Sequence, residues 1–138
     1  AVLYGLHNVF SKAAAGARSA AGAGIADVHG ALVVEVAAVL SIALYFLLFA
    51  RSGSWNAAPR AYVWSAVAGL CAGLGTIAYF AIFTRGGELS TAGPIVLLGG
   101  VAIMSIAGLV VFGEPLTVKK ALGLALGAAG IYLLKSSG

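Results

Sequence analysis

The chain has 138 residues, of which 62% are hydrophobic and only 9% are charged, and its formal net charge is +4. Soluble domains carry a charge on about a quarter of their residues, so these few charges exclude a water-soluble domain and predict a protein that lies mainly in lipid. The lysines and arginines fall mostly between apolar runs, where lipid headgroups would meet them, and this distribution does not resemble the basic patch of a nucleic-acid-binding protein.

Apolar runs and the turns between them predict five helices, at residues 1–18, 30–50, 60–84, 92–112 and 117–135. The first helix carries five polar residues on one face: Tyr4, His7, Asn8, Ser11 and Lys12. A polar face directed into lipid would be costly, so we expect it to line a cavity or to face another helix. Two alternatives stay open. Lys12 could extend to the headgroups while Asn8 bonds a neighbouring helix, or the whole segment could lie on the bilayer surface.

The second predicted helix follows a loop rich in glycine and alanine, and its apolar run contains a single charged residue, Glu35. A charged carboxylate is disfavoured in a low-dielectric environment, so this position is a candidate for function. Glu35 could bind a cationic substrate, carry a coupling proton, or pair with Lys12 or His7. A structural ion pair, or a position near the membrane surface, remains an equal alternative.

The third predicted helix follows a turn at residues 51–60, where Trp55 is expected to anchor the chain at the membrane surface. One face of this helix combines small, hydroxyl and aromatic side chains: Ser65, Gly69, Ala72, Thr76, Tyr79 and Phe83. Such a face suits a binding cavity, and it suits ordinary tight packing equally well. Thr76 and Tyr79 are its candidate binding residues.

In the last two predicted helices, small residues and one proline are the main features. Pro94 is expected to open the fourth helix, with a flexible Gly-Pro hinge as the alternative. Gly123 and Gly127 are four residues apart in the fifth helix, and this spacing predicts a seam for close helix packing. Lysines near the start of that helix can extend to the headgroups.

Five crossings would divide the lysines and arginines almost evenly between the two sides of the membrane. One side would hold Arg51, Arg60, Lys119 and Lys120, and the other would hold Arg18, Arg85 and Lys135. Because orientation follows the imbalance of these residues, the chain has little reason to insert in one direction only. We therefore expect dual topology, in which two copies pair in opposite orientations; the alternative is a single orientation set by preceding residues.

The sequence contains no pattern typical of an enzyme or a metal site. It lacks a paired carboxylate, metal-ligand spacing of histidine and cysteine, a nucleophile elbow and a phosphate-binding glycine loop. His7 and His29 are isolated, and Cys71 is alone within an apolar run. We therefore expect neither catalysis nor a metal or cofactor.

The run Gly113-Glu114-Pro115-Leu116-Thr117, followed by a glycine-rich last helix, resembles the end of an EamA-type repeat of the drug/metabolite transporter superfamily. The stretches Tyr4–Lys12 and Ser90–Pro94 are similar to the starts of the first and fourth helices of that repeat. The resemblance covers essentially the whole chain. It implies one all-α transmembrane domain over residues 1–138, a bundle of five transmembrane helices that forms one half of an inverted-repeat, ten-helix transporter.

The resemblance also implies a multi-pass protein of a prokaryotic cell membrane that works as a homodimer, antiparallel if the inverted arrangement is kept, or with a related chain. The last helix is similar to the dimerising helix of the four-helix small multidrug resistance proteins as well. Those proteins bind protons and cations with a glutamate in their first helix, where this chain has no acid. That role therefore cannot be transferred to Glu35.

These observations favour a secondary transporter that moves a small metabolite by alternating access, with its site near the membrane midplane between two protomers. The expected substrate-binding residues are Tyr4, His7, Asn8, Lys12, Glu35, Thr76 and Tyr79. A lysine and a histidine in the site would favour an anionic or zwitterionic substrate. Two other functions stay open: a flippase for lipid-linked molecules and a non-transporting scaffold subunit. Membrane lipids are expected partners in each case, and nucleic acid in none.

Overall fold

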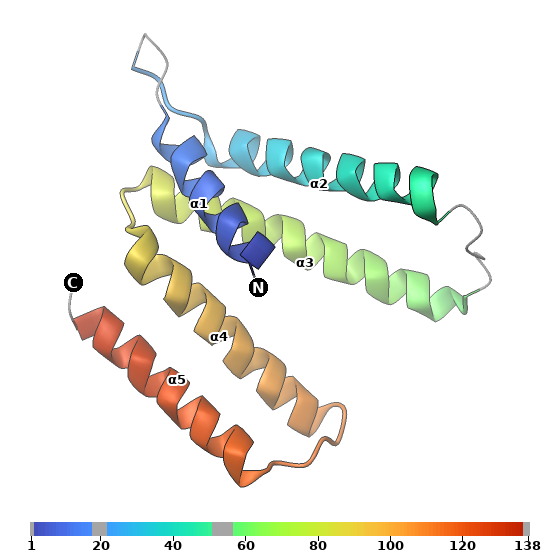
Figure 1. Cartoon of the computed structure of the whole chain (residues 1–138), viewed down its shortest axis with the longest axis vertical. Helices are drawn as coiled ribbons and strands as arrows, with labels where there is room; N and C mark the ends of the chain where they lie inside the picture. The colour runs from blue at the N-terminus through green and yellow to red at the C-terminus, as the bar shows by residue number, and fades with distance from the viewer. Residues whose placement is uncertain (1, 18–21, 51–56, 137–138) are drawn as a thin grey trace. The chain divides into compact units, whose positions relative to one another are not determined.

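The computed structural model of the protein describes residues 2–17, 22–50 and 57–136. These residues form five helices: α1 (Val2–Gly16), α2 (Asp27–Phe49), α3 (Pro59–Thr84), α4 (Leu89–Val110) and α5 (Val118–Ser136) (Figure 1). The prediction of an all-α protein is therefore confirmed for the described part of the chain. The helices form two compact units, Ala1–Gly86 and Gly87–Gly138, and each is described by itself.

Three of the helices that the structure describes, α2, α3 and α4, are long and apolar enough to cross a membrane. They contain 23, 26 and 22 residues. A rise of about 1.5 Å per residue gives each of them more than the roughly 30 Å of a hydrocarbon core. α1 has 15 residues, and α5 carries lysines at both ends, so neither reaches the same combination of length and apolarity. Of the five predicted crossings, these three are supported.

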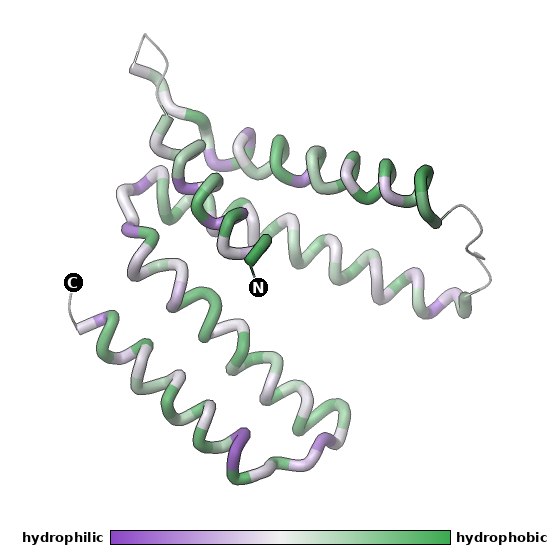
Figure 2. The backbone as a smooth tube through the Cα atoms, in the orientation of Figure 1, coloured by the Kyte–Doolittle hydropathy of each residue, from purple (hydrophilic) through white to green (hydrophobic). Residues whose placement is uncertain are grey.

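The helices α2, α3 and α4 consist mainly of apolar residues, as the green colour in Figure 2 shows, and many of their large side chains are exposed. On α2, Leu40, Ile42 and Leu48 are each more than 60% exposed. Leaving this much apolar surface in water would be unfavourable, and lipid tails or further helices remove that cost. The hydrophilic residues gather near helix ends and along α1.

In the first unit, α2 and α3 pack side by side in opposite directions. Three pairs set their register: Asp27 with Thr84, Gly30 with Phe80, and Glu35 with Thr76. A glycine is required at position 30 because a Cβ there would overlap the Phe80 ring. The Phe80 side chain is fully buried, so this close approach forms the centre of the helix pair.

α1 crosses this helix pair and completes the small core of the unit (Figure 1). The buried residues are Ser11 and Ala15 on α1, Gly30 and Ala31 on α2, and Tyr79, Phe80 and Phe83 on α3. The aromatic rings supply the volume and the alanines and glycine let the helices approach. The core lies at the end of the unit where α2 begins and α3 ends.

In the second unit, α4 and α5 form an antiparallel hairpin. A Cβ at Gly127 would lie 3.6 Å from the Leu98 side chain, and one at Gly130 would lie 3.8 Å from it, so both glycines face α4. Nothing lies within 4 Å of a Cβ at Gly123. The close contact on α5 therefore uses Gly127 with Gly130, rather than the predicted pair of Gly123 and Gly127, because these two share the face turned to Leu98.

Two helices begin three residues earlier than the sequence predicted. α2 begins at Asp27, where an acidic residue in the first turn is stabilised by the unpaired backbone N–H groups of the helix start. α4 begins at Leu89, so Pro94 lies inside the helix instead of opening it. A proline there cannot donate to the Ser90 carbonyl, and the helix continues with one hydrogen bond fewer. The predicted anchor Trp55, with Arg18 and Arg51, lies outside the described residues.

Candidate functional site

The first unit contains a carboxyl–hydroxyl pair between its two long apolar helices. Thr76 Oγ1 lies 2.6 Å from Glu35 Oε1, and both side chains are half-buried. The residues are 41 positions apart in the chain and meet because α2 and α3 pack antiparallel. Glu35 lies about 12 Å along α2 from its first residue, Asp27, and Thr76 lies about 12 Å along α3 from its last residue, Thr84. The pair is therefore well within the apolar segments and away from the helix ends.

The Thr76 hydroxyl has a second contact, since Oγ1 also lies 3.0 Å from the carbonyl oxygen of Ala72 on the preceding turn of α3. Threonine in a helix often bonds the carbonyl four residues back. The hydroxyl thus lies between one oxygen of its own helix and one of α2.

The polar face of α1 is directed largely into the unit. Ser11 is buried at 2% exposure, and His7, Asn8 and Lys12 are half-buried. The Lys12 ammonium lies over the Phe83 ring of α3, 5.3 Å from its centroid, a distance at which a cation is attracted to the ring face. These residues lie on the side of α1 that meets α2 and α3.

Tyr4 is the predicted site residue that lies apart from this face. Its side chain is 69% exposed, and its ring lies 5.8 Å from the His7 ring. Tyr4 lies about one turn closer to the start of α1 than His7. At that position the side chain is exposed rather than turned toward the neighbouring helices. Within this unit it contributes surface rather than core.

Two buried hydroxyl groups have no hydrogen-bond partner among the residues that the structure describes: Ser11 Oγ on α1 and Tyr79 Oη on α3. The Tyr79 ring packs edge-on against Phe83, with 4.8 Å between the ring centroids. A buried hydroxyl without a partner costs free energy, so each of these groups is a place where a water molecule or a polar ligand would be stabilised.

A polar cluster closes the end of the α2–α3 pair. The Thr84 hydroxyl donates to Asp27 Oδ1, and an Arg85 guanidinium nitrogen lies 4.0 Å from Asp27 Oδ2. The sequence prediction assigned no role to Asp27, because it was placed in the loop before the second helix. The antiparallel register that joins Glu35 to Thr76 also brings Asp27 to Thr84, and only the helix pairing reveals both contacts.

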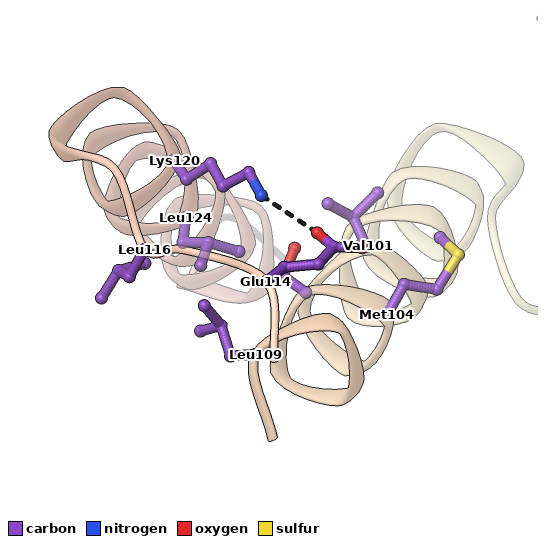
Figure 3. Close-up of a pocket in the computed structure, with 8 residues that line it drawn as sticks. Val101, Met104, Leu109, Glu114, Leu116, Lys120 and Leu124 are labelled. Atoms are coloured by element: carbon purple, nitrogen blue, oxygen red, sulfur yellow. Dashed lines mark hydrogen bonds and ion pairs between the residues drawn. The ribbon is translucent and has the colours of Figure 1, made fainter. Parts of the chain in front are cut away.

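The second unit has a pocket of about 260 Å³ between α4, α5 and the turn that joins them (Figure 3). It is lined by Val101, Met104, Ser105, Leu109, Glu114, Leu116, Lys120 and Leu124. Lys120 Nζ donates to Glu114 Oε2 at 3.0 Å across its mouth, and both side chains are about half exposed. An ion pair this exposed contributes little to stability, about 1 kcal/mol or less.

The turn that positions Glu114 depends on two glycines. Gly113 has a φ of 64°, in the left-handed region that other residues seldom adopt, and this reverses the chain after α4. The Glu114 N–H then donates to the Gly108 carbonyl at 2.9 Å. The Glu114 carboxylate lies so close to Gly108 that a Cβ there would be 3.1 Å from Oε2. Thr117 caps α5 by accepting the Lys120 N–H at 3.2 Å.

The turn Gly113–Thr117 carries the sequence resemblance, but Glu114 and Lys120 were not predicted as site residues. Their pairing follows from the cap at Thr117, which places Lys120 in the first turn of α5. A charged residue six positions after an opposite charge, across the turn at residues 115–117 and a helix start, is the signal that could have identified them.

The described residues thus define an all-helical protein with three helices able to cross a membrane and with polar groups between α2 and α3. No group of three or more histidine, cysteine, aspartate or glutamate side chains in the described ranges is placed to hold a metal ion. No protein-family model, curated protein or solved structure matches the sequence.

Proposed function

We propose that the protein is a secondary transporter that moves a small metabolite across a membrane by alternating access. The observation that carries the proposal is the hydrogen bond between Glu35 and Thr76 inside two apolar helices. Carboxyl groups inside membrane-spanning segments are costly, and in membrane proteins they mark pathways for substrates and ions. Further polar contacts would come from the half-buried His7, Asn8 and Lys12. The hydroxyls of Ser11 and Tyr79, which have no hydrogen-bond partner among the described residues, would add to them.

A transporter of this kind requires α1 and α5 to cross the membrane as well, which gives a bundle of five transmembrane helices. The proposal includes a second copy, or a related chain, in the opposite orientation, so that the two form the inverted halves of a ten-helix EamA-type transporter. The nearly even distribution of lysine and arginine and the resemblance at Gly113–Thr117 support this arrangement. A substrate would then lie between the polar layers of the two chains.

Transport currents from the purified protein test the proposal. Proteoliposomes adsorbed on a solid-supported membrane are challenged with amino acids, organic acids, organic cations and sugars, with and without a pH gradient. We expect a current for one class of solute, and we expect Glu35→Gln and Lys12→Met to reduce it at least tenfold. Each variant has a matched control at an exposed position outside the candidate spans, Glu88→Gln and Lys135→Met, which should keep the current.

The outcomes separate the three functions. A current that survives both substitutions would keep the transporter and reject this site. If folded protein gives no current with any solute, the transporter proposal is wrong, and movement of a labelled lipid-linked molecule, or isolation of a stable complex with other subunits, would indicate a flippase or a scaffold.

A further inference from the structure

Three oxygen atoms in the first unit form a short row: Glu35 Oε1, Thr76 Oγ1 and the Ala72 carbonyl oxygen. The two separations are 2.6 Å and 3.0 Å, and both are hydrogen-bond distances. A threonine hydroxyl has one proton to donate and lone pairs to accept, whereas a carbonyl oxygen only accepts. Thr76 therefore cannot donate to both neighbours at once, and the position of its proton must depend on whether Glu35 carries one.

Both protonation states of Glu35 are satisfied by this row without movement of a heavy atom. When Glu35 is ionised, the Thr76 hydroxyl donates to Oε1. When Glu35 is protonated, its own O–H donates to Thr76 Oγ1, and the threonine proton turns to the Ala72 carbonyl. A carboxyl group whose neighbour can only donate a hydrogen bond, or can only accept one, favours one protonation state over the other. Here rotation of the Thr76 hydroxyl satisfies both protonation states of Glu35.

We infer that Glu35 carries the coupling proton of the transporter and that Thr76 is the positioning residue that accommodates both of its states. This inference rests on the proposed function and adds the identity of the coupling ion. A proton from water on one side of the membrane forms an O–H bond with the carboxylate, and the same bond breaks when the proton passes to water on the other side. No other bond changes and no further reactant is needed.

Besides Glu35, the first unit has buried or half-buried titratable groups on each of its three helices. The titratable side chains that are buried or half-buried on the two helices packed against α2 are His7 and Lys12 on α1 and Tyr79 on α3. On α2 itself Asp27 is half-buried, about 12 Å away along the helix, and it is engaged by Thr84 and Arg85. The direct hydrogen bond that the structure gives Glu35 comes from Thr76, a neutral side chain.

Infrared difference spectroscopy of the substrate-free protein in lipid nanodiscs tests the inference. On acidification we expect a new C=O stretching band of a protonated carboxyl group, absent in Glu35→Gln and present in the matched control Glu88→Gln. We expect Thr76→Val to keep the band and move it to higher wavenumber, because the carboxyl O–H loses its acceptor. Thr76→Ser retains the hydroxyl and should restore the original position.

Each result decides a specific part of the inference. Spectra that are the same for the native protein and Glu35→Gln would overturn it, and so would a band that does not move in Thr76→Val. The threonine variants keep the test valid even if Glu35→Gln does not fold. Because no substrate is added, the two failures can be told apart. A Glu35 band without any transport current would reject the proposed function, and the coupling role with it, but keep the protonation of Glu35 beside Thr76. A current without the band would reject this inference alone.

Discussion

At the scale of single residues, the buried hydroxyl of Tyr79 has a clear energetic cost. Tyr79 is 8% exposed, and its hydroxyl has no hydrogen-bond partner among the described residues. Phenylalanine would fill the same space, including the edge-on contact with Phe83, without that cost. A tyrosine at this position is therefore explained better by a ligand or a water molecule than by packing.

Replacement of Tyr79 by phenylalanine should leave the free energy of unfolding unchanged or raise it by up to about 1 kcal/mol, because an unsatisfied buried hydroxyl is removed. In the same variant the transport current should fall, because the ligand contact is lost. Thermal unfolding in detergent and the solid-supported assay measure the two effects. Tyr45→Phe, at an exposed position on α2, is the control. A clear loss of stability would show that the hydroxyl is hydrogen-bonded in the membrane.

At the scale of helices, one close contact sets the α2–α3 register on which both polar pairs depend. Gly30 faces the fully buried Phe80 ring, and Glu35 with Thr76 lies farther along the same interface. Because apolar side chains gain little from leaving lipid for a helix interface, packing and hydrogen bonds determine which helix faces meet. A glycine against an aromatic ring is therefore a strong determinant of this register.

Gly30→Ala should lower the free energy of unfolding by about 1–3 kcal/mol, because its Cβ would overlap the Phe80 ring and the helices must separate. Adding Phe80→Leu should recover part of that loss. Gly69→Ala on α3 is the control, since nothing lies within 4 Å of a Cβ there. Unfolding monitored in detergent measures all of the variants. Equal behaviour of Gly30→Ala and Gly69→Ala would contradict the packing at this contact.

At the scale of the whole molecule, the distribution of positive charge bears on how the protein inserts in the membrane. Among the described residues, Arg60, Lys119 and Lys120 would share one side if all five helices cross, with Arg85 and Lys135 on the other. Lys12, within α1, is assigned to neither side. A difference this small gives the membrane-insertion machinery little to discriminate. Dual topology would supply the inverted second copy that the proposed transporter needs.

Impermeant thiol labelling tests this orientation. In a background with Cys71 replaced by alanine, single cysteines are introduced at Gly22 and at Ala57, before and after α2. We expect each position to label from both sides of the membrane in about equal amounts. Two added lysines beside Ala57 should shift the labelling strongly to one side. Labelling of each cysteine from a single side in the unaltered background would show that the chain inserts in one orientation.

Much of the fold was accessible from the sequence because helix formation in lipid depends on local composition. Apolar runs with polar turns between them predicted five helices, and the structure has them with ends shifted by up to a few residues. The shift at Asp27 arose because an acidic residue in the first turn stabilises the start of α2, and the shift at Leu89 arose because α4 tolerates an internal proline. The periodicity of α1 also predicted that a polar face is turned inward, and Ser11 and Lys12 lie there.

The sequence by itself determined the membrane environment, the helices and the list of polar residues within them, because these depend on the chemistry of neighbouring positions. Only the tertiary structure decided which polar residues meet. Glu35 meets Thr76, and Asp27 meets Thr84, because α2 and α3 pack at Gly30 and Phe80 in one antiparallel register. Contacts between residues 41 or more positions apart depend on that packing, which no local pattern encodes.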